Sequence, residues 1–364
     1  MWLEDWAATE ALLGGAGALD ALAFSTGAMV RRRDVRDGSQ LLRVALGYAA
    51  TGQSLRTTAA WSDAALGVDL SDPALIGRLS RCGEFLSALV SQLLASGAPV
   101  GEPAAAWEGP PIRLVDGSVF TGPGKKGVGH RLHAAYDPAR GWFTHFDLTR
   151  LDAGENLTRC DIEAGSIAVG DRNYARTWAL REVAEREAFF CVRAGASSVS
   201  MIEAATQEKL TAITLVDRLG DRESLDIPVI LSEAKGKKKQ PLSARLIVIR
   251  ASQATQQREQ ARIERSKSKQ GVTPRPDTYA MAKVMLILTN LPEQDWPIGN
   301  LHALYRLRWQ IELAFKTLKS VFAMRNVPSK TPQMARTWIL ANLAAALLAD
   351  RLLNAFQGDI PPSE

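Results

Sequence analysis

The segment Leu301–Val321 most constrains the fold, because its apolar and polar residues separate onto two sides of a helix. Its apolar residues recur at steps of three and four, the spacing of an amphipathic helix packed against a core. Four polar residues share the other side: Tyr305, Arg308, Glu312 and Lys319. At about 3.6 residues per turn they fall within an arc of roughly 60°. We therefore predict one helix that presents a carboxylate between cations.

An ordinary solvated helix face is the alternative interpretation of this segment. Arg308 and Glu312 would then form an i,i+4 pair worth only about 0.3 kcal/mol. Charged helix faces are common and usually contact nothing but solvent. The choice between the two interpretations depends on the rest of the chain.

Composition and length describe an ordinary globular protein. The chain has 364 residues, of which 46% are hydrophobic and 23% charged, enough for two or three packed units. Cys82, Cys160 and Cys191 are too scattered for a disulfide framework or a CxxC metal site, so we expect a reducing cytosol. The apolar stretch Leu12–Val30 has the wrong flanking charges for a secretory signal. The apolar stretch Ile339–Ala349 is too short for a membrane span.

Positive charge is concentrated in one part of the sequence. The formal net charge is +5, yet the segment Lys235–Lys283 holds thirteen basic residues against three acidic ones, which leaves the remainder at −5. A local excess of this kind is typical of a surface that contacts the phosphate backbone of nucleic acid. The alternative is a solvated loop, above all at the lysine tract Lys235–Lys239.

The first 108 residues are predicted to be helical, with apolar residues at helical spacing and with Ser71 or Asp72 as a helix cap. The third and fourth helices and their turn fit a helix-turn-helix, although helical hairpins are also common scaffolds. The predicted helices are Glu4–Leu13, Gly38–Gly52, Ser54–Leu66 and Pro73–Leu94.

A Gly-, Pro- and Ala-rich linker, Gly97–Pro111, separates this part from strand-like segments. The first strand, Ile112–Ser118, delivers Asp116 into a turn. The strands Arg131–Tyr136 and Trp142–Leu148 follow it in an antiparallel meander. The later short strand Ser166–Gly170 ends at Asp171, so a second strand delivers a second aspartate.

The remaining segments complete a mixed α/β core. A helix at Arg176–Glu187, a strand at Ala188–Arg193, a resumed core strand at Val284–Leu288 and a final helix at Gln333–Phe356 are expected, with residues 156–164 as a further short helix. The predicted domains are a helical N-terminal domain (1–108), a catalytic core (109–195 and 283–357), a β-rich basic insertion (196–282) and a tail (358–364).

Three carboxylates, Asp116, Asp171 and Glu312, point to metal chemistry. Oxygen ligands of this kind suit Mg²⁺ or Mn²⁺, which keep several waters and bind only a few carboxylates. Two such ions about 3.5–4 Å apart activate an attacking hydroxyl and stabilise a leaving oxygen in phosphodiester cleavage.

Taken together, Asp116, the run Asp171–Tyr174 and the polar face of Leu301–Val321 resemble the bacterial insertion-sequence DDE transposases with a Tyr-Arg-Glu-Lys signature, the insertion-sequence-four group. The resemblance extends over essentially the whole chain. It implies an RNase H-like mixed-sheet core interrupted by a β-rich insertion, with a helical N-terminal domain. It also implies two Mg²⁺ ions (or Mn²⁺) held by Asp116, Asp171 and Glu312. Terminal DNA would be held by the signature residues Tyr305, Arg308 and Lys319.

Arg172 and Tyr174 are further candidate DNA contacts, with a salt bridge for Arg172 and core packing for Tyr174 as open alternatives. Some relatives place a tryptophan before the signature helix to hold a flipped base, where this chain has Ala282–Met285. Tyr279 or Trp296 could supply such a stacking surface, although packing roles are favoured for both.

Two weaker motifs are assigned structural roles. His130 and His133 have no third ligand at a recognisable spacing and are expected to be a surface pair on a strand. The loop Gly122–Gly129 lacks a phosphate-loop pattern. It is predicted to be a hairpin whose Lys125 and Lys126 touch DNA.

The predicted function is that of a metal-dependent DNA transposase, which cleaves the ends of its element and joins the freed 3′-hydroxyl to target DNA. Its partners would be double-stranded DNA, namely terminal inverted repeats and target, and a second copy in the synaptic complex. We expect it in the cytoplasm at the nucleoid, with no membrane partner. The alternatives are an inactivated DNA-binding descendant and an RNase H-like nuclease without strand transfer.

Overall fold

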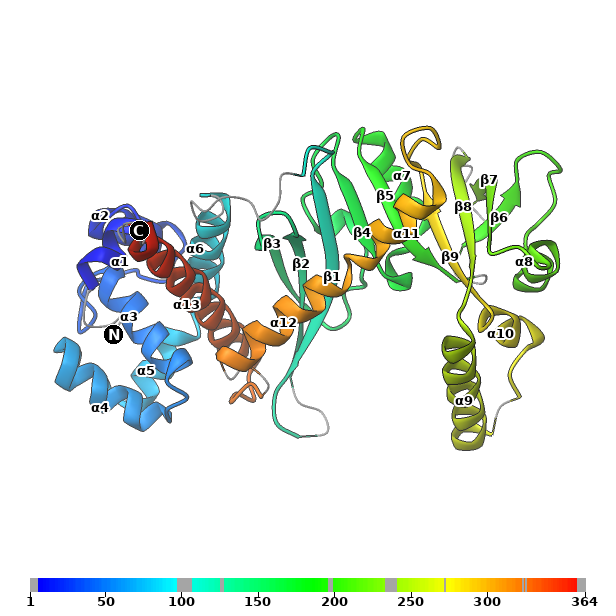
Figure 1. Cartoon of the computed structure of the whole chain (residues 1–364). Coiled ribbons are helices and arrows are strands. Elements are labelled where there is room, and N and C mark those ends of the chain that lie inside the picture. Colours follow the sequence, from blue (N-terminus) through cyan, green and yellow to red (C-terminus); the bar gives the residue numbers. More distant parts are fainter. Residues whose placement is uncertain are drawn as a thin grey trace, which may run out of the picture.

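A helical part and one large sheet with helices on both faces make up the computed structural model (Figure 1). It describes residues 6–96, 107–124, 128–195, 199–232, 241–271, 273–322, 324 and 326–358. Most of the predicted linker, at 97–106, lies outside these ranges, as do Lys125, Lys126 and the tract Lys235–Lys239.

The helical part begins with α1 to α6, and three of these helices start at side-chain caps. Asp37, Ser54 and Ser71 each accept a hydrogen bond from a backbone N–H in the first turn of their helix, which satisfies donors that the helix leaves unpaired. The bounds are α1 (Trp6–Leu12), α2 (Ala16–Ser25), α3 (Gly38–Ala50), α4 (Leu55–Leu66), α5 (Asp72–Leu79) and α6 (Gly83–Ala95).

Two features of this part differ from the sequence prediction. The single helix Pro73–Leu94 is wrong, because between α5 and α6 the N–H groups of Arg81 and Cys82 bond three residues back, to Arg78 and Leu79, instead of four. The sequence prediction also omits α2, whose small apolar residues show little contrast between its faces. Among the described residues no single helix has the length and apolarity to cross a membrane. Among the described helix pairs, α1 and α2 reach the required length and apolarity when they are counted together, but they are bent by 63° relative to each other.

The last helix, α13 (Pro332–Gly358), belongs spatially to this part. It packs against α3 and α6, and the Thr337 hydroxyl donates to the Leu79 carbonyl at 2.7 Å. Both ends of the described chain, in α1 and α13, therefore lie in the helical part (Figure 1). The final helix was expected, but within the catalytic core rather than against α3 and α6.

Within the described ranges the sheet has nine strands in the order β3-β2-β1-β4-β5-β9-β8-β7-β6. The neighbouring strands β1, β4 and β5 are parallel to one another, and all other neighbouring pairs are antiparallel. The meander of β1, β2 and β3 is confirmed. The bounds are β1 (Ile112–Thr121), β2 (Gly129–Asp137), β3 (Trp142–Arg150), β4 (Ile167–Gly170), β5 (Phe189–Ala194), β6 (Ser200–Glu203), β7 (Ser224–Ser232), β8 (Leu242–Arg250) and β9 (Val284–Thr289).

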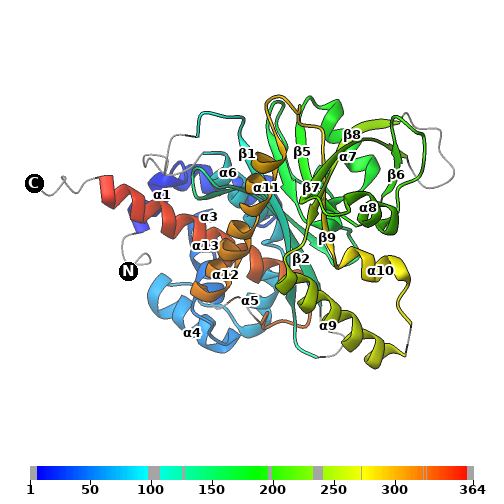
Figure 2. The same ribbon diagram turned by 45° about the vertical axis from the view of Figure 1, so that its right-hand side comes forward.

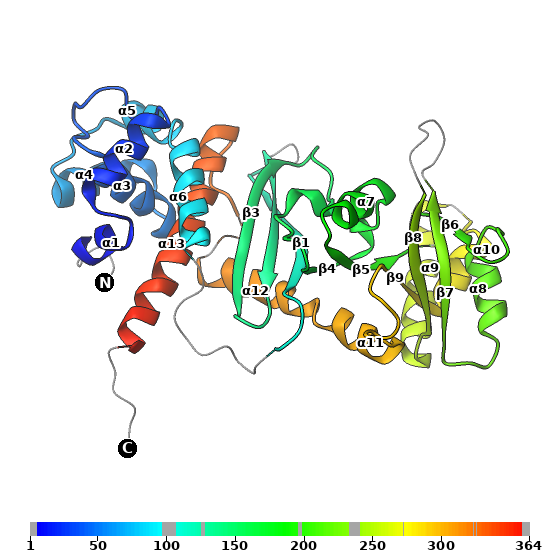
Figure 3. The same cartoon turned by 90° about the horizontal axis from the view of Figure 1, so that it is seen from above.

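Helices cover the two faces of the sheet (Figure 3). Leu114 and Val169 point to the face covered by α11 (Ile298–Arg306) and α12 (Trp309–Val321), and they share an apolar cluster with residues of both helices. Val115 and Ala168 point to the face covered by α7 (Thr177–Glu185) and share a second cluster with it. Alternation along each strand produces this division.

The predicted insertion extends the core sheet, because β8 pairs with β9 and β7 and β6 follow. It also contains α8 (Ala212–Leu219), α9 (Gln253–Gln270) and α10 (Pro276–Met281). The insertion was expected to be β-rich, and α9 lacks the apolar periodicity that would have predicted a helix. Residues 156–164, conversely, form only the short 3₁₀ turn Leu157–Arg159.

Arg245 on β8 ties the outer strands to the chain that follows β9. Its guanidinium pairs with Asp226 on β7 and donates to the carbonyls of Leu291, at 2.7 Å, and Trp296, at 3.2 Å. Its side chain is only 13% exposed, so the pair is shielded from water.

We predict that Arg245→Ala lowers the free energy of unfolding by roughly 2–4 kcal/mol, because it leaves the Asp226 carboxylate unpaired at a poorly hydrated position. Urea denaturation followed by circular dichroism measures this. Arg150→Ala is the control, since Arg150 and its partner Asp152 are 78% and 77% exposed, and a change below about 0.5 kcal/mol is expected there. Equal losses in the two variants would refute the assignment.

Candidate active site

Asp116 lies within a strand. β1 stays paired with β2 past this position as far as Thr121, opposite Gly129, so the prediction that Asp116 enters a turn is wrong. The Asp116 carboxylate accepts a hydrogen bond from the Gly117 N–H at 2.8 Å. Its half-buried side chain points to the same face as Leu114, the face covered by α11 and α12.

The parallel register of β1 and β4 brings the two aspartates together. Val115 is opposite Gly170, and Asp171 continues in extended geometry, so Asp116 and Asp171 are the next pair across. Adjacent strands lie about 4.8 Å apart. Both side chains therefore project from one face of the sheet as neighbours.

A cation continues this row on β5. Gly170 is opposite Val192, so Arg193 stands beside Asp171 on the same face. The structure gives the Arg193 side chain no hydrogen bond or ion pair to any described residue, although its charge acts on Tyr305. The sequence prediction missed Arg193. The available signal was one charged residue in the otherwise apolar strand Phe189–Ala194.

The predicted single helix over Leu301–Val321 is in fact two. Between α11 and α12 the N–H groups of Leu307 and Arg308 bond three residues back, to Leu304 and Tyr305, which is the tighter 3₁₀ pattern. Leu307 and Arg308 keep right-handed helical dihedrals. The polar residues therefore remain neighbours across the break.

Arg308 links the signature residues. It pairs with Glu312 at 2.6 Å, and its guanidinium carbon lies 5.9 Å from the centre of the Tyr305 ring. Tyr305 is 8% exposed, and burial raises the pKa of its phenol. Glu312, by contrast, has a side chain that is 55% exposed.

Lys319 anchors the other end of α12 to β1. Its ammonium group donates to the Val119 carbonyl at 2.9 Å and lies 4.6 Å from the centre of the Phe120 ring. Burial lowers the pKa of this amine. The contacts keep α12 alongside β1, with Glu312 toward the Asp116 end.

The three carboxylates share one electrostatic environment. The pKa of Asp116 is raised to about 6, first by burial and further by the charges of Glu312 and Asp171, while the Gly117 hydrogen bond and Arg308 oppose the rise. No group of three His, Cys, Asp or Glu side chains in the described part of the chain is close enough to hold a metal ion together. Glu312 is paired with Arg308 instead.

The donor set nevertheless fits a hard divalent cation. Asp116 and Asp171 offer carboxylate oxygens side by side, as Mg²⁺ and Mn²⁺ require. Neighbouring carboxylates repel each other in a half-buried position, and a cation relieves that repulsion.

Arg172 and Tyr174, the further DNA-contact candidates, lie in different surroundings. Arg172 is exposed, and its side chain makes no ion pair within the described residues. Tyr174 is 1% exposed. A side chain at Gly170 would bring its Cβ within 3.0 Å of the Tyr174 Cβ. Tyr174 therefore packs in the core, the alternative that sequence left open.

The remaining aromatic and histidine candidates contact other residues of the chain. Tyr279 donates its hydroxyl to Glu264 at 2.8 Å, and the Trp296 ring lies 6.3 Å from that of Trp107. His130 and His133 are 4% and 0% exposed. The expectation of a surface histidine pair is therefore wrong, because β3 and its neighbouring elements cover this part of β2.

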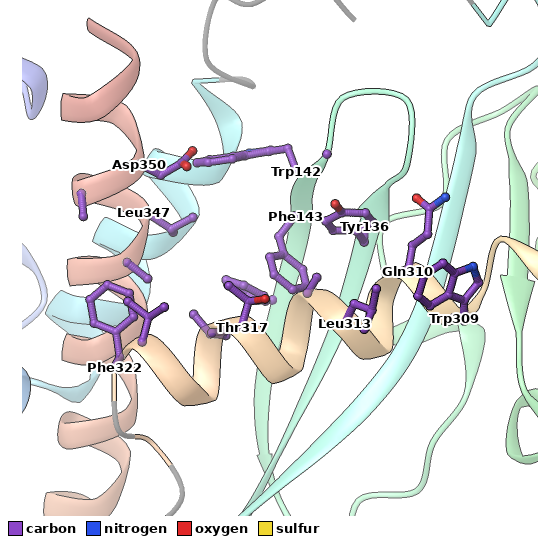
Figure 4. A pocket seen from close by; sticks show the side chains of 17 residues that line it. Tyr136, Trp142, Phe143, Trp309, Gln310, Leu313, Thr317, Phe322, Leu347 and Asp350 are labelled. Carbon is purple, nitrogen blue, oxygen red and sulfur yellow. The ribbon is translucent and has the colours of Figure 1, made fainter. Parts of the chain in front are cut away.

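A large cavity lies on another side of α12. It encloses about 750 Å³ between α12, the β2–β3 turn and α13, and Figure 4 shows Phe143, Leu313 and Thr317 lining it. At about 100° per residue, Leu313 and Thr317 are roughly 100–140° round the helix from Glu312. Its mainly apolar lining does not suit a phosphate.

Two aspartates and an arginine thus stand in a row on a mixed sheet and face a helix that bears Glu312 and further cations. These are the groups that a carboxylate-based enzyme acting on phosphodiesters needs. Comparison with known proteins gives the family. The chain belongs to the transposase DDE domain family, whose model matches residues 107–348. It is therefore a divalent-metal-dependent enzyme that acts on DNA in the manner of an insertion-sequence transposase.

Relatives with insertion-sequence names cover nearly the whole chain. The candidate transposase InsL of element IS186A from Escherichia coli is 34% identical over 367 residues, 99% of this chain and 96% of its own. The transposase of element IS421 from Escherichia coli is 34% identical over 368 residues with the same coverage. The transposase of element IS231B from Bacillus thuringiensis is 25% identical over 245 residues, 59% of this chain and 50% of its own.

We predict that Asp116→Asn stabilises the metal-free protein at pH 7.5 by about 1–3 kcal/mol. A carboxyl with a raised folded pKa destabilises the fold fully above that pKa, near 6, and not at all below its unfolded value of about 3.9. The gain should therefore shrink as pH falls toward 4. Thermal unfolding in EDTA at both pH values measures it, and a loss of stability at pH 7.5 would contradict the crowding of these carboxylates.

Proposed function

We propose that the chain is a transposase of the Tyr-Arg-Glu-Lys group with an RNase H-like catalytic core. Two observations support this assignment. The adjacent parallel strands β1 and β4 carry Asp116 and lead into Asp171, and helix α12 faces both strands. The helical part would bind DNA, and the extended sheet of residues 196–282 would flank the site.

Asp116 and Asp171 are proposed to hold two Mg²⁺ ions, with Mn²⁺ as a substitute, and Glu312 completes the ligand set. The single observation that carries this proposal is the register that makes the two aspartates neighbours. Bound ions would activate the attacking hydroxyl and stabilise the leaving oxygen. Water would attack first, and the freed 3′-hydroxyl would then attack target DNA.

Cations around the carboxylates are proposed to orient the DNA strand. Arg308 and Arg193 flank the carboxylates, and an Arg fork suits phosphate oxygens. Tyr305 supports Arg308 from beneath, and Lys319 borders β1. The substrate would be the terminal inverted repeats of the element, followed by target DNA at the nucleoid, with a dimer holding the two ends.

Two rival functions use the same fold. An inactivated descendant would bind DNA without cutting, but the presence of Asp116, Asp171 and Glu312 favours an active enzyme. An RNase H-like nuclease would cut without joining. Insertion-sequence relatives over 99% of the chain favour the transposase.

We predict that Glu312→Gln abolishes Mg²⁺-dependent nicking and strand transfer, with a loss of at least about 100-fold, while DNA affinity stays within a factor of about three. The assay uses DNA carrying the ends of the element and separates nicked from joined products. Binding without chemistry in the wild type would indicate the inactive descendant. Nicks without joined products would indicate the nuclease.

Arg193 provides a second test of the site. Arg193→Met should slow cleavage by about 10–100-fold, because a charge-assisted contact is worth roughly 1.5–3 kcal/mol, and Arg193→Lys should recover only part of the rate. Arg186→Met is the control, since Arg186 follows α7 on the opposite face of the sheet. A rate for Arg193→Met equal to that of the control would remove Arg193 from the proposed site.

A further inference from the structure

Helix α9 has no apolar face to explain its position. None of its described residues is buried, and only Ile263 is a large apolar residue. Its ends are well formed, with Ser252 capping the first turn and Gly271 in left-handed geometry after the last. A long helix that is polar all round lacks the packing that usually holds a helix in place. Figure 2 shows it projecting beyond the sheet.

The charge of α9 is positive, with five Lys or Arg residues against two Glu. Its ion pairs are long: Arg262 lies 3.8 Å from Glu259, and Lys267 lies 3.9 Å from Glu264. Pairs of this length on an exposed helix contribute little. Arg262 and Lys267 therefore remain available to an external anion.

One side of α9 lines a cavity of about 330 Å³ that also includes Arg172, the residue after Asp171. Arg172 faces Arg262 and Lys267 there, so three cations from two separate elements converge. Ser266 and Thr278 add hydroxyl donors to the lining, and Glu259 is its acidic member.

Along the order of the strands, α12 and α9 lie on either side of β4, the strand that ends at Asp171. α12 lies against β1, whereas α9 follows β8, three strands beyond β4 in the sheet order. Consecutive Cα atoms are about 3.8 Å apart, and phosphates along one DNA strand rise about 3.4 Å per nucleotide. A phosphate in the cavity would thus belong to a nucleotide close to the scissile bond.

We propose that Arg172, Arg262 and Lys267 form a phosphate-binding site for the DNA backbone next to the cleavage position, and that α9 stands where it does to complete this site. The proposal rests on the proposed function and deepens it. DNA crossing the active site would be held between α12 on one side and α9 on the other.

The test compares two charge-matched double variants in a Glu312→Gln background, so that binding is measured without cleavage. Arg262→Ala/Lys267→Ala removes two cations from the cavity. Arg258→Ala/Arg265→Ala removes two cations of the same helix that do not line the cavity. The probe is a duplex with the end sequence of the element that encodes the chain.

The affinity for this duplex is measured between 50 and 200 mM salt. In a second measurement, single phosphates of the duplex are replaced with neutral methylphosphonates and the change in affinity is recorded. For the cavity pair, the slope of log affinity against log salt should fall by about 0.9 for each lost contact, and for the control pair it should not change. Replacing a phosphate near the cleavage position should lower the DNA affinity of the parent protein. The same replacement should leave the affinity of the cavity pair and of Arg172→Ala unchanged.

Equal effects of the two double variants, or an unchanged methylphosphonate pattern in the cavity pair, would overturn the proposal. The second result is also expected if the cavity binds an acidic protein segment instead of DNA. Circular dichroism checks that all variants fold. Because the readout is binding, a wild-type protein that binds with the predicted pattern but never cleaves would contradict the proposed function and leave this site standing.

Discussion

The parallel pairing of β1 with β4 is the constraint on which the site depends. Because Val115 pairs with Gly170 in the register of the two strands, Asp116 and Asp171 are neighbours on one face. A shift of one residue would turn one of the aspartates into the opposite, apolar face against α7. The apolar residues that precede each aspartate hold this register, since Leu114 and Val169 are fully buried on one face and Val115 and Ala168 on the other. Core packing therefore determines where the chemistry takes place.

The same geometry is unfavourable for the metal-free protein. Burial and neighbouring carboxylates raise the pKa of Asp116, so the fold holds charges close together that would separate in an unfolded chain. Arg308 offsets part of this repulsion through Glu312. Under the proposed function, Arg308 also donates hydrogen bonds to a phosphate of the DNA. Binding of DNA and of metal would therefore exchange the partners of Arg308 and Glu312 within one small region.

Sequence reasoning identified most local elements and missed several tertiary relations. The capped helices and the meander follow from local rules, and the spacing of Tyr305, Arg308 and Glu312 survived a break in the helix because both residues at the break remain helical. The position of Asp116 within a strand depends on pairing with β2, which a single strand does not encode. Arg193 becomes notable only when the order of β1, β4 and β5 is known. Helix α9 could not be found by periodicity, because it has no apolar stripe.

The docking of α13 against α3 and α6 has a consequence for synthesis. A ribosome makes the N-terminal helices first, yet the helix that completes their core is the last to emerge. The helical part therefore reaches its full packing only after the whole chain has left the ribosome. A product that stops early has every residue of α1 to α6 but lacks the partner that buries them.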